Sequence, residues 1–203
     1  WQNTIGGAGY ENLRCLLQTS DNNFVIGGWS TSGAGFDKTE PRMGKSDLWI
    51  LKLDTVGQII WQNSIGGSEE DEIFGILEKD GQFWLAASST SMAGYDKSED
   101  SKGDADFWIV KLDTSGIVLW NKTYGGSAGD FTKDLTITKD GNIMIGGFTV
   151  SDRSEDKSED CFGNKDNWII VVDSVGNLLS ELSIGGQERD YLYSTQRTGA
   201  GDI

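Results

Sequence analysis

Histidine is absent from this 203-residue sequence, and its absence excludes several kinds of catalysis. Ser-His-Asp and Cys-His nucleophiles, and metal sites built on imidazole, all need that side chain. No glycine-rich phosphate loop occurs between a strand and a helix. Acidic residues are plentiful, at 32, so paired carboxylates of the kind that hydrolyse glycosides remain available. Among enzymes, the sequence therefore favours a carbohydrate-active one.

Proline and cysteine are also scarce, with one and two residues, whereas glycine occurs 28 times. Many tight turns with little proline are typical of β-structure. Cys15 and Cys161 occupy different places in the repeat described below. We therefore expect two free thiols rather than a disulfide.

Basic residues are outnumbered, 17 against 32, which gives a net charge of −15. Such a charge repels phosphate backbones and anionic membrane surfaces, so we expect no nucleic-acid partner. No run approaches the roughly 18 apolar residues that cross a bilayer, and we expect no membrane insertion. The chain starts at Trp1 with no methionine and no signal sequence, so we interpret it as a processed chain or an excerpt.

The sequence contains an internal repeat of about sixty residues. Glycine pairs recur at spacings of 60, 59 and 60 residues, and they open at Gly6, Gly66, Gly125 and Gly185. A tryptophan keeps the same register, at Trp49, Trp108 and Trp168. These landmarks indicate a single repeat domain, 1–203, with units of about 1–60, 61–119 and 120–179 and a partial unit, 180–203.

Each unit is predicted to hold four short strands. In the second unit two apolar stretches flank the hairpin turn Asp80–Gly81, and two more flank a turn that ends at Gly116. No unit shows a helical period of apolar residues. The pattern predicts an all-β fold, a β-propeller-like array of four-stranded antiparallel blades, with a parallel β-helix as the alternative.

The number of units is too small for an ordinary ring. The stretch Trp1–Gly7 reads as the last strand of a preceding unit, and the stretch 190–196 reads as the first strand of a following one. About three and a half repeats do not close a propeller, which usually has at least four blades. We therefore expect part of a larger propeller, completed by a longer chain or by self-association.

The third unit carries many landmarks, at Trp120, Lys122, Thr123, Gly125, Gly126, Ser127, Asp130, Thr138, Asp140, Gly141, Gly147, Ser151, Asp156, Lys157, Ser158, Gly163, Asp166, Trp168, Asp173 and Gly176. This pattern resembles the roughly sixty-residue repeats of secreted and cell-surface proteins of Bacteroidetes. It departs from them at Val171 and Ser180, where lysine and tryptophan are expected. The resemblance implies a secreted or cell-surface location. Members commonly leave the cell by type IX secretion, with a C-terminal signal that this chain lacks.

The resemblance also implies O-glycosylation, because Bacteroidetes modify Asp-Ser or Asp-Thr followed by a small or aliphatic residue. Two places match this pattern, Asp54-Thr55-Val56 and Asp173-Ser174-Val175. The expected acceptors are therefore Thr55 and Ser174.

An acidic loop in each unit is the most distinctive polar feature, written DKTEPRMGKSD, DKSEDSKGDAD and DKSEDCFGNKD. Hard cations such as Ca²⁺ take six to eight oxygen ligands from carboxylates, carbonyls and water. The candidate ligands are Asp37, Glu40, Asp47, Asp96, Glu99, Asp100, Asp104, Asp106, Asp156, Glu159, Asp160 and Asp166. In the alternative interpretation, the first and last aspartate of each loop accept backbone N–H bonds and hold the loop ends together. Ca²⁺ is the one cofactor indicated, and none is required.

Aromatic residues supply two further hypotheses. Trp49, Trp108 and Trp168 recur inside apolar strands, which favours packing between blades over the stacking of sugars. The less regular aromatics are better candidates for contact with a ligand, and they are Trp29, Trp84, Phe148 and Tyr191.

We therefore expect a non-enzymatic repeat module of a secreted or cell-surface bacterial protein, a scaffold or adhesion platform that binds glycan or protein. The alternatives are a fragment of a carbohydrate-active propeller enzyme and a purely structural spacer. Non-repeated acids and aromatics at one end of the channel would favour the enzyme. Only repeat-equivalent residues there would favour the scaffold.

Overall fold

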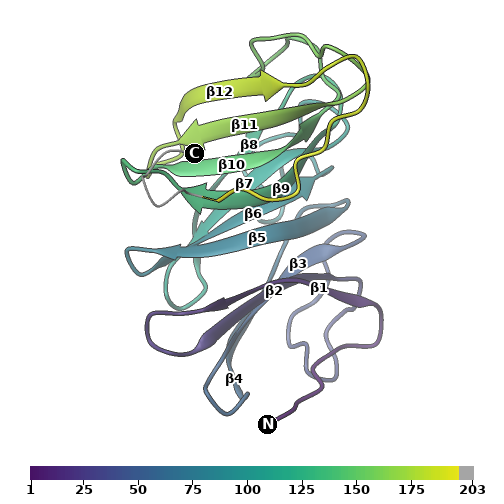
Figure 1. Ribbon diagram of the computed structural model, residues 1–203. Coiled ribbons are helices and arrows are strands. Elements are labelled where there is room, and N and C mark those ends of the chain that lie inside the picture. Colours follow the sequence, from purple (N-terminus) through teal and green to yellow (C-terminus); the bar gives the residue numbers. More distant parts are fainter. Residues whose placement is uncertain (197–203) are drawn as a thin grey trace.

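A computed structural model describes residues 1–196, which form three four-stranded antiparallel sheets and no helix (Figure 1). The first sheet holds β1 (Glu11–Gln18), β2 (Phe24–Ser30), β3 (Asp47–Leu53) and β4 (Ile59–Ile65). The second holds β5 (Asp71–Lys79), β6 (Gln82–Ser89), β7 (Asp106–Leu112) and β8 (Val118–Tyr124). The third holds β9 (Asp130–Ile137), β10 (Ile143–Thr149), β11 (Asp166–Val172) and β12 (Leu178–Ile184). The all-β prediction and the four strands in each unit are confirmed.

Within each sheet, every strand pairs with the next strand along the chain. Each sheet takes its fourth strand from the start of the following sequence unit, because β4 and β8 run past residues 60 and 119. The part of the chain that the structure describes has no helix long and apolar enough to cross a membrane.

Tight turns with left-handed backbone join the strands where the turn residues predicted them. Asp80 and Gly81 have φ angles of 54° and 69° between β5 and β6. Asn22, between β1 and β2, has a φ of 65°. The turns before β4 and β8 contain Gly57 and Gly116, with φ angles of 83° and 86°. Glycine, asparagine and aspartate tolerate this region better than other residues, so they set the position of each turn.

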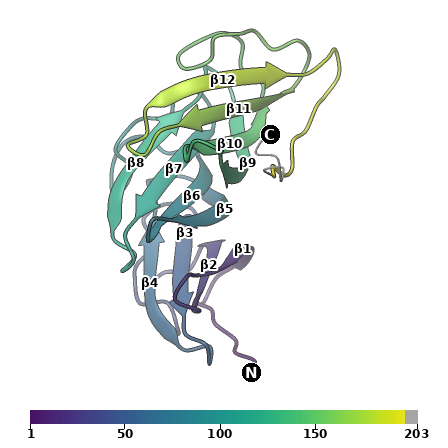
Figure 2. The ribbon, with the colours of Figure 1, turned by 60° about the vertical axis from the view of Figure 1, so that its left-hand side comes forward.

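The three sheets follow one another along an arc (Figure 2). The first strands, β1, β5 and β9, lie on the inner side of this arc, whereas β4, β8 and β12 lie on its outer side. Because β5 contacts both β1 and β9, the first strands form a continuous inner layer.

Apolar cores fill the spaces between neighbouring sheets. Val25 and Ile50 of the first sheet pack with Phe83 and Trp108 of the second. The opposite face of the second sheet packs with Trp168 and its neighbours in the third. Trp108 and Trp168 are both fully buried. The predicted packing between sheets is therefore confirmed for Trp108 and Trp168, and sugar stacking is wrong for these two. Trp49 lies outside both cores, in a cluster with Leu51 and Leu53 of its own strand.

Each first strand carries a β-bulge, in which one extra residue interrupts the pairing with the second strand. In β1 the pairing skips Arg14, and in β5 it skips Phe74. In β9 it skips Lys133. Small residues on the second strand make room for the bulge. A methyl group added at Gly147, for example, would lie 2.0 Å from the carbonyl oxygen of Phe131.

The two ends of the described chain form no strand, so the strands expected at Trp1–Gly7 and 190–196 are corrected. A strand needs a hydrogen-bonded neighbour, and residues 1–196 contain no partner strand for either segment. The expected side-chain register is nevertheless present. The Trp1 indole donates to the Thr55 carbonyl at 2.8 Å, as the Trp61 indole does to the Thr114 carbonyl at 3.1 Å.

The two cysteines lie apart. Cys15 is in β1 and Cys161 is in the loop before β11, and both are free thiols, as expected. Burial raises the pKa of the Cys15 thiol to about 12, so it packs as a small apolar side chain.

Candidate functional site

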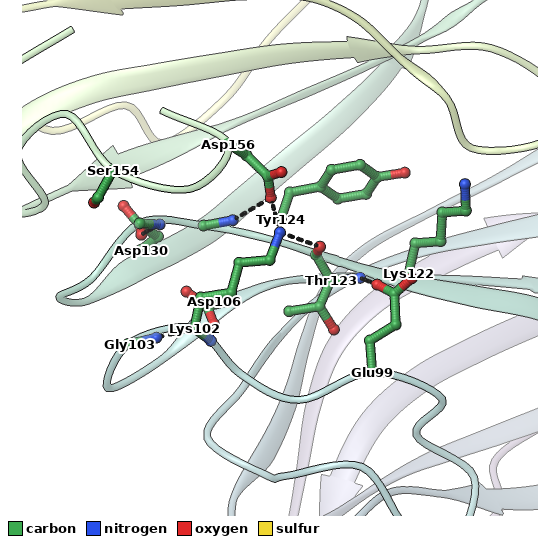
Figure 3. A network of polar contacts seen from close by, with 12 residues as sticks. Glu99, Lys102, Gly103, Asp106, Lys122, Thr123, Tyr124, Asp130, Ser154 and Asp156 are labelled. Atoms are coloured by element: carbon green, nitrogen blue, oxygen red, sulfur yellow. Dashed lines mark hydrogen bonds and ion pairs between the residues drawn. The ribbon is translucent and has the colours of Figure 1, made fainter. Parts of the chain in front are cut away.

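The acidic loops precede β3, β7 and β11. Figure 3 shows the network in which Lys102 and Asp106, from the loop before β7, meet Asp156 from the loop before β11. The first aspartate of each loop binds the glycine pair that ends the preceding unit's last strand. Asp96 Oδ2 accepts the Gly66 N–H at 3.2 Å, and Asp156 Oδ2 accepts the Gly125 N–H at 3.1 Å. Asp37 does the same for Gly6, at 3.0 Å. The first aspartate of each loop therefore joins that loop to the glycine pair of the preceding unit.

The last aspartate of each loop is fully buried and binds its own loop. Asp47 accepts the N–H groups of Met43 and Gly44, at 2.7 and 3.0 Å. Asp106 accepts the Lys102 N–H at 2.5 Å, and Asp166 accepts the N–H of its loop's Phe162 at 2.7 Å. These contacts confirm the interpretation that the first and last aspartates hold backbone N–H groups.

The lysine that follows the first aspartate of each loop points its ammonium group into the interior of the loop. Lys97 is 2% exposed, and its ammonium donates to the Glu99 carbonyl at 2.8 Å, to Ser101 Oγ at 3.2 Å and to Thr123 Oγ1 at 3.0 Å. Burial lowers the pKa of Lys97, and the charges of Asp106 and other acids oppose that shift.

The same lysine arrangement recurs in the other two units. Lys38 donates to the Glu40 carbonyl and to Ser64 Oγ, and Lys157 donates to the Glu159 carbonyl and to Ser183 Oγ. An ammonium group therefore occupies the place in each loop where inward-facing oxygens converge.

Most remaining loop carboxylates bind peptide N–H groups. Glu40 and Glu99 accept the N–H groups of Ser64 and Thr123, at 2.5 and 2.8 Å. Asp100 and Asp160 accept N–H groups within their own loops, at 2.8 and 3.0 Å. Asp104 and Glu159 are exposed.

No metal ligand set is assembled among these carboxylates. Across residues 1–196, no three His, Cys, Asp or Glu side chains lie close enough together to hold a metal ion. Most acids of each loop instead accept the protein's own N–H groups. The calcium hypothesis stays a prediction.

A second buried aspartate faces each junction, four residues after the second glycine of the pair. Asp130 Oδ2 accepts the Gly126 N–H at 2.7 Å and the Ser151 hydroxyl at 3.0 Å. The Oδ1 atoms of Asp106 and Asp130 are buried and accept no hydrogen bond from the described residues. Burial, reinforced by the charge of Asp130, raises the pKa of Asp106 to about 6. The Asp106 carboxyl therefore takes up a proton at a higher pH than an ordinary aspartate does.

The expected glycosylation acceptors lie in turns at the protein surface. Thr55 is exposed in the turn between β3 and β4, and Ser174 is exposed in the turn between β11 and β12. Their carbonyls accept bonds from the Trp1 indole and the Lys111 ammonium, and no hydrogen bond within residues 1–196 is recorded for their side-chain hydroxyls. Both hydroxyls are therefore open to modification.

The inner layer of the arc holds a cluster that breaks the repeat. The three bulged residues, Arg14, Phe74 and Lys133, occupy equivalent positions but differ in chemistry. The Arg14 guanidinium lies 5.3 Å from the centre of the Phe74 ring, and the Lys133 ammonium lies 4.0 Å from it. Cations therefore flank an aromatic ring across three sheets.

The cluster continues over the third sheet. The Phe148 ring lies 5.2 Å from the Lys133 ammonium and 3.8 Å from the Lys165 ammonium. Lys165 also lies 4.5 Å from the centre of the Tyr191 ring. We call this set the cation–aromatic row; its members are Arg14, Phe74, Lys133, Phe148, Lys165 and Tyr191.

The sequence pointed to only two members of the row, Phe148 and Tyr191. Three of the other four could have been found by aligning the units, since Arg14, Phe74 and Lys133 each lie three residues after the acid that follows a glycine pair. That position changes from arginine to phenylalanine to lysine, while the acid three residues before it repeats. Trp29 and Trp84, the other two candidates, lie outside the row, and Trp84 is buried in a core between sheets.

Comparison with known proteins assigns no family. No protein-family model matches the chain. It is similar to the regulatory protein FlaEY of Caulobacter vibrioides, with 24% identity over 144 residues, which is 68% of this chain and 15% of that protein. The chain therefore spans a small part of the length of that relative.

Two solved structures show a partial likeness to the chain. A protein of unknown function from Bacteroides caccae has a TM-score of 0.44 and 12% identity, over 97% of this chain and 61% of that one. A variant of the apocarotenoid oxygenase of Synechocystis has a TM-score of 0.49 and 12% identity, over 88% of this chain and 40% of that one. Neither likeness carries an argument about activity.

Proposed function

We propose that the chain is a non-enzymatic repeat module of a secreted or cell-surface bacterial protein, a rigid scaffold that presents a binding surface for glycan or protein. The observation that carries this proposal is that the polar side chains at the sheet junctions bind the protein's own peptide groups. Buried lysines and aspartates recur in all three units, and they bind peptide groups of their own or the neighbouring unit. Such groups serve architecture, because a catalytic pair would be expected once.

We further propose that the three sheets are consecutive blades of a β-propeller that is larger than this chain. The inner first strands and the arc of sheets support this arrangement (Figure 2). In a propeller the innermost strands line a central channel. The cation–aromatic row would then face that channel.

An apolar groove on the first sheet supports the continuation of the array. It has a volume of about 370 Å³, and its lining includes Trp1, Ile5, Leu13, Leu16, Ile26 and Trp29. Leu13 is 60% exposed, whereas Ile73 at the equivalent place in the second sheet is fully buried against the first sheet. We propose that another unit of the same repeat packs there, with Trp1 already in the register of that unit's last strand.

Extracellular location gives the first test of the proposal. Intact cells of the native host are treated with an external protease, and the chain is followed with an antibody in the cell surface, medium and cytosol fractions. We expect loss of the surface signal or recovery from the medium. Recovery only from the cytosol, protected from protease, would contradict the proposal.

A second test separates scaffold from enzyme. The purified chain is incubated with a panel of polysaccharides, and new reducing ends are measured. We expect none, because the buried acids repeat in every unit and bind peptide N–H groups. Turnover that is lost on substitution of a single carboxylate would establish an enzyme instead.

A further inference from the structure

The cation–aromatic row concentrates positive charge on an acidic protein. Three of the 17 basic residues lie in it, in a chain with a net charge of −15. Arg14 has one acidic partner, Glu72, at 3.6 Å. Neither Lys133 nor Lys165 forms an ion pair or a hydrogen bond through its ammonium with any of residues 1–196. Two half-buried cations are thus held by aromatic faces and lack an anion.

The charges in the row act on one another. Burial lowers the pKa of Lys133, the positive charges of Arg14 and Lys165 lower it further, and Glu72 opposes them. Three cations within mutual range repel one another, and one carboxylate does not balance them. An anion placed between Lys133 and Lys165 would relieve this repulsion.

The aromatic members offer flat apolar surface next to the cations. Tyr191 and Tyr193 stack at 6.0 Å with an angle of 17° between their rings, and they are 41% and 72% exposed. The nearly buried Phe148 supports Tyr191 from its edge, at 5.4 Å. The C–H faces of a pyranose ring pack well on such exposed aromatic surface.

From these features we infer that the cation–aromatic row binds a saccharide carrying a carboxylate, whose ring lies on the tyrosines and whose charge lies between Lys133 and Lys165. This inference rests on the proposed function, because it names the ligand class of the same scaffold. Polyanions such as nucleic acids fit less well, since the rest of the surface repels them. The required carboxylate belongs to an acidic sugar, either a uronic acid or a sialic acid.

Calorimetric titration with matched sugars tests the inference. The probes are trigalacturonate, sialyllactose and the methyl esters of both, so each acid has a neutral counterpart of nearly the same shape. We expect heat of binding for at least one acid and at least about tenfold weaker binding of its neutral counterpart. The acid that binds also distinguishes a uronic from a sialic ligand. Equal binding of acid and neutral probes, or binding of neither acid, would overturn the inference.

Variants locate the site on the row. Lys133→Met and Lys165→Met should each weaken binding of the acid about tenfold and should reduce its dependence on salt. Lys139→Met is the matched control, because Lys139 is exposed outside the row, and it should leave binding unchanged. Tyr191→Ala should weaken the acid and its neutral counterpart together. Lys133→Gln replaces Lys133→Met if that variant does not fold, as judged by circular dichroism. Unchanged binding in both lysine variants overturns the inference.

The outcome is separable from the proposed function. A chain that binds no acidic sugar but lies on the cell surface keeps the scaffold proposal and removes only the ligand. A chain found in the cytosol that still binds the acid through Lys133 and Lys165 removes the surface role and keeps the site.

Discussion

The buried carboxyls at the sheet junctions predict a protein that becomes more stable as the solution is mildly acidified. Asp106 is fully buried, and burial raises its pKa from 3.8 to about 6. A raised pKa in the folded state means that the folded chain binds more protons than the unfolded chain. Stability therefore rises as pH falls through the folded pKa, and it is lost as pH returns to 7.

The size of the effect follows from the two pKa values. At pH 5 a carboxyl with a pKa of about 6 is about 90% protonated, and one with a pKa of 3.8 is about 6% protonated. The difference makes unfolding about 1.4 kcal/mol less favourable at pH 5 than at pH 7. For a chain of this size that corresponds to a rise of about 3–6 °C in the melting temperature. Burial also raises the pKa values of Asp71 and Asp130, which adds in the same direction.

The Asp106→Asn variant isolates the contribution of this carboxyl. Asparagine keeps an oxygen that accepts the Lys102 N–H, and it does not titrate. Urea unfolding followed by tryptophan fluorescence at pH 5, 6 and 7 should show a stability gain on acidification that is smaller by about 1.4 kcal/mol in the variant than in the wild type. Asp104→Asn, at an exposed position in the same loop, should keep the full gain. The same pH slope for Asp106→Asn and the wild type would refute the reasoning.

Four further predictions concern the junction and the surface. Gly125→Ala places a methyl group 1.9 Å from Asp106 Oδ1 and should lower the free energy of unfolding by about 1–3 kcal/mol. Gly33→Ala is the control, because open space surrounds Gly33, and it should leave stability unchanged. Equal losses for the two variants in urea unfolding would contradict the close approach. Lys97→Met leaves the buried oxygens around its ammonium without a donor and should cost about 2–3 kcal/mol. Lys139→Met, at an exposed position, is the control for this variant. In a separate measurement, millimolar Ca²⁺ should not raise the melting temperature of the wild-type protein, and a rise would favour the calcium hypothesis. In protein from the native host, peptides that contain Thr55 or Ser174 should carry a sugar mass that Thr55→Val and Ser174→Ala remove, and finding only the unmodified peptides would contradict glycosylation.

The strands were predictable because turn residues and apolar stretches recur together at the same positions of each repeat unit. Turn residues such as Asp80 and Gly81 demand positive φ, and they fall between apolar stretches of strand length. The buried tryptophans were predictable for the same reason, since Trp108 and Trp168 recur within such stretches. The end strands were not, because pairing depends on a neighbouring strand that residues 1–196 do not supply at either end.

The junction lysines illustrate what composition hides. A lysine next to an acidic loop reads as a solvated surface charge, since lysine is rarely buried. Lys97 is buried because the Glu99 carbonyl and two hydroxyls converge on it from different parts of the chain. That convergence depends on how the loop before β7 meets β8, which is a tertiary contact. The sequence showed the acids and left the role of the lysine unassigned.

The cation–aromatic row was not predicted from the sequence, because the residue type at the bulge position differs from one repeat unit to the next. A bulge turns one side chain out of each first strand, so Arg14, Phe74 and Lys133 come together although about sixty residues separate each from the next. Replacing such a side chain alters neither the ladder nor the junction network, because neither uses it. Repeat positions that bind peptide groups can therefore stay constant while the bulge positions vary. This division of labour gives a repeat array one scaffold on which the inner surface is free to specialise for a ligand.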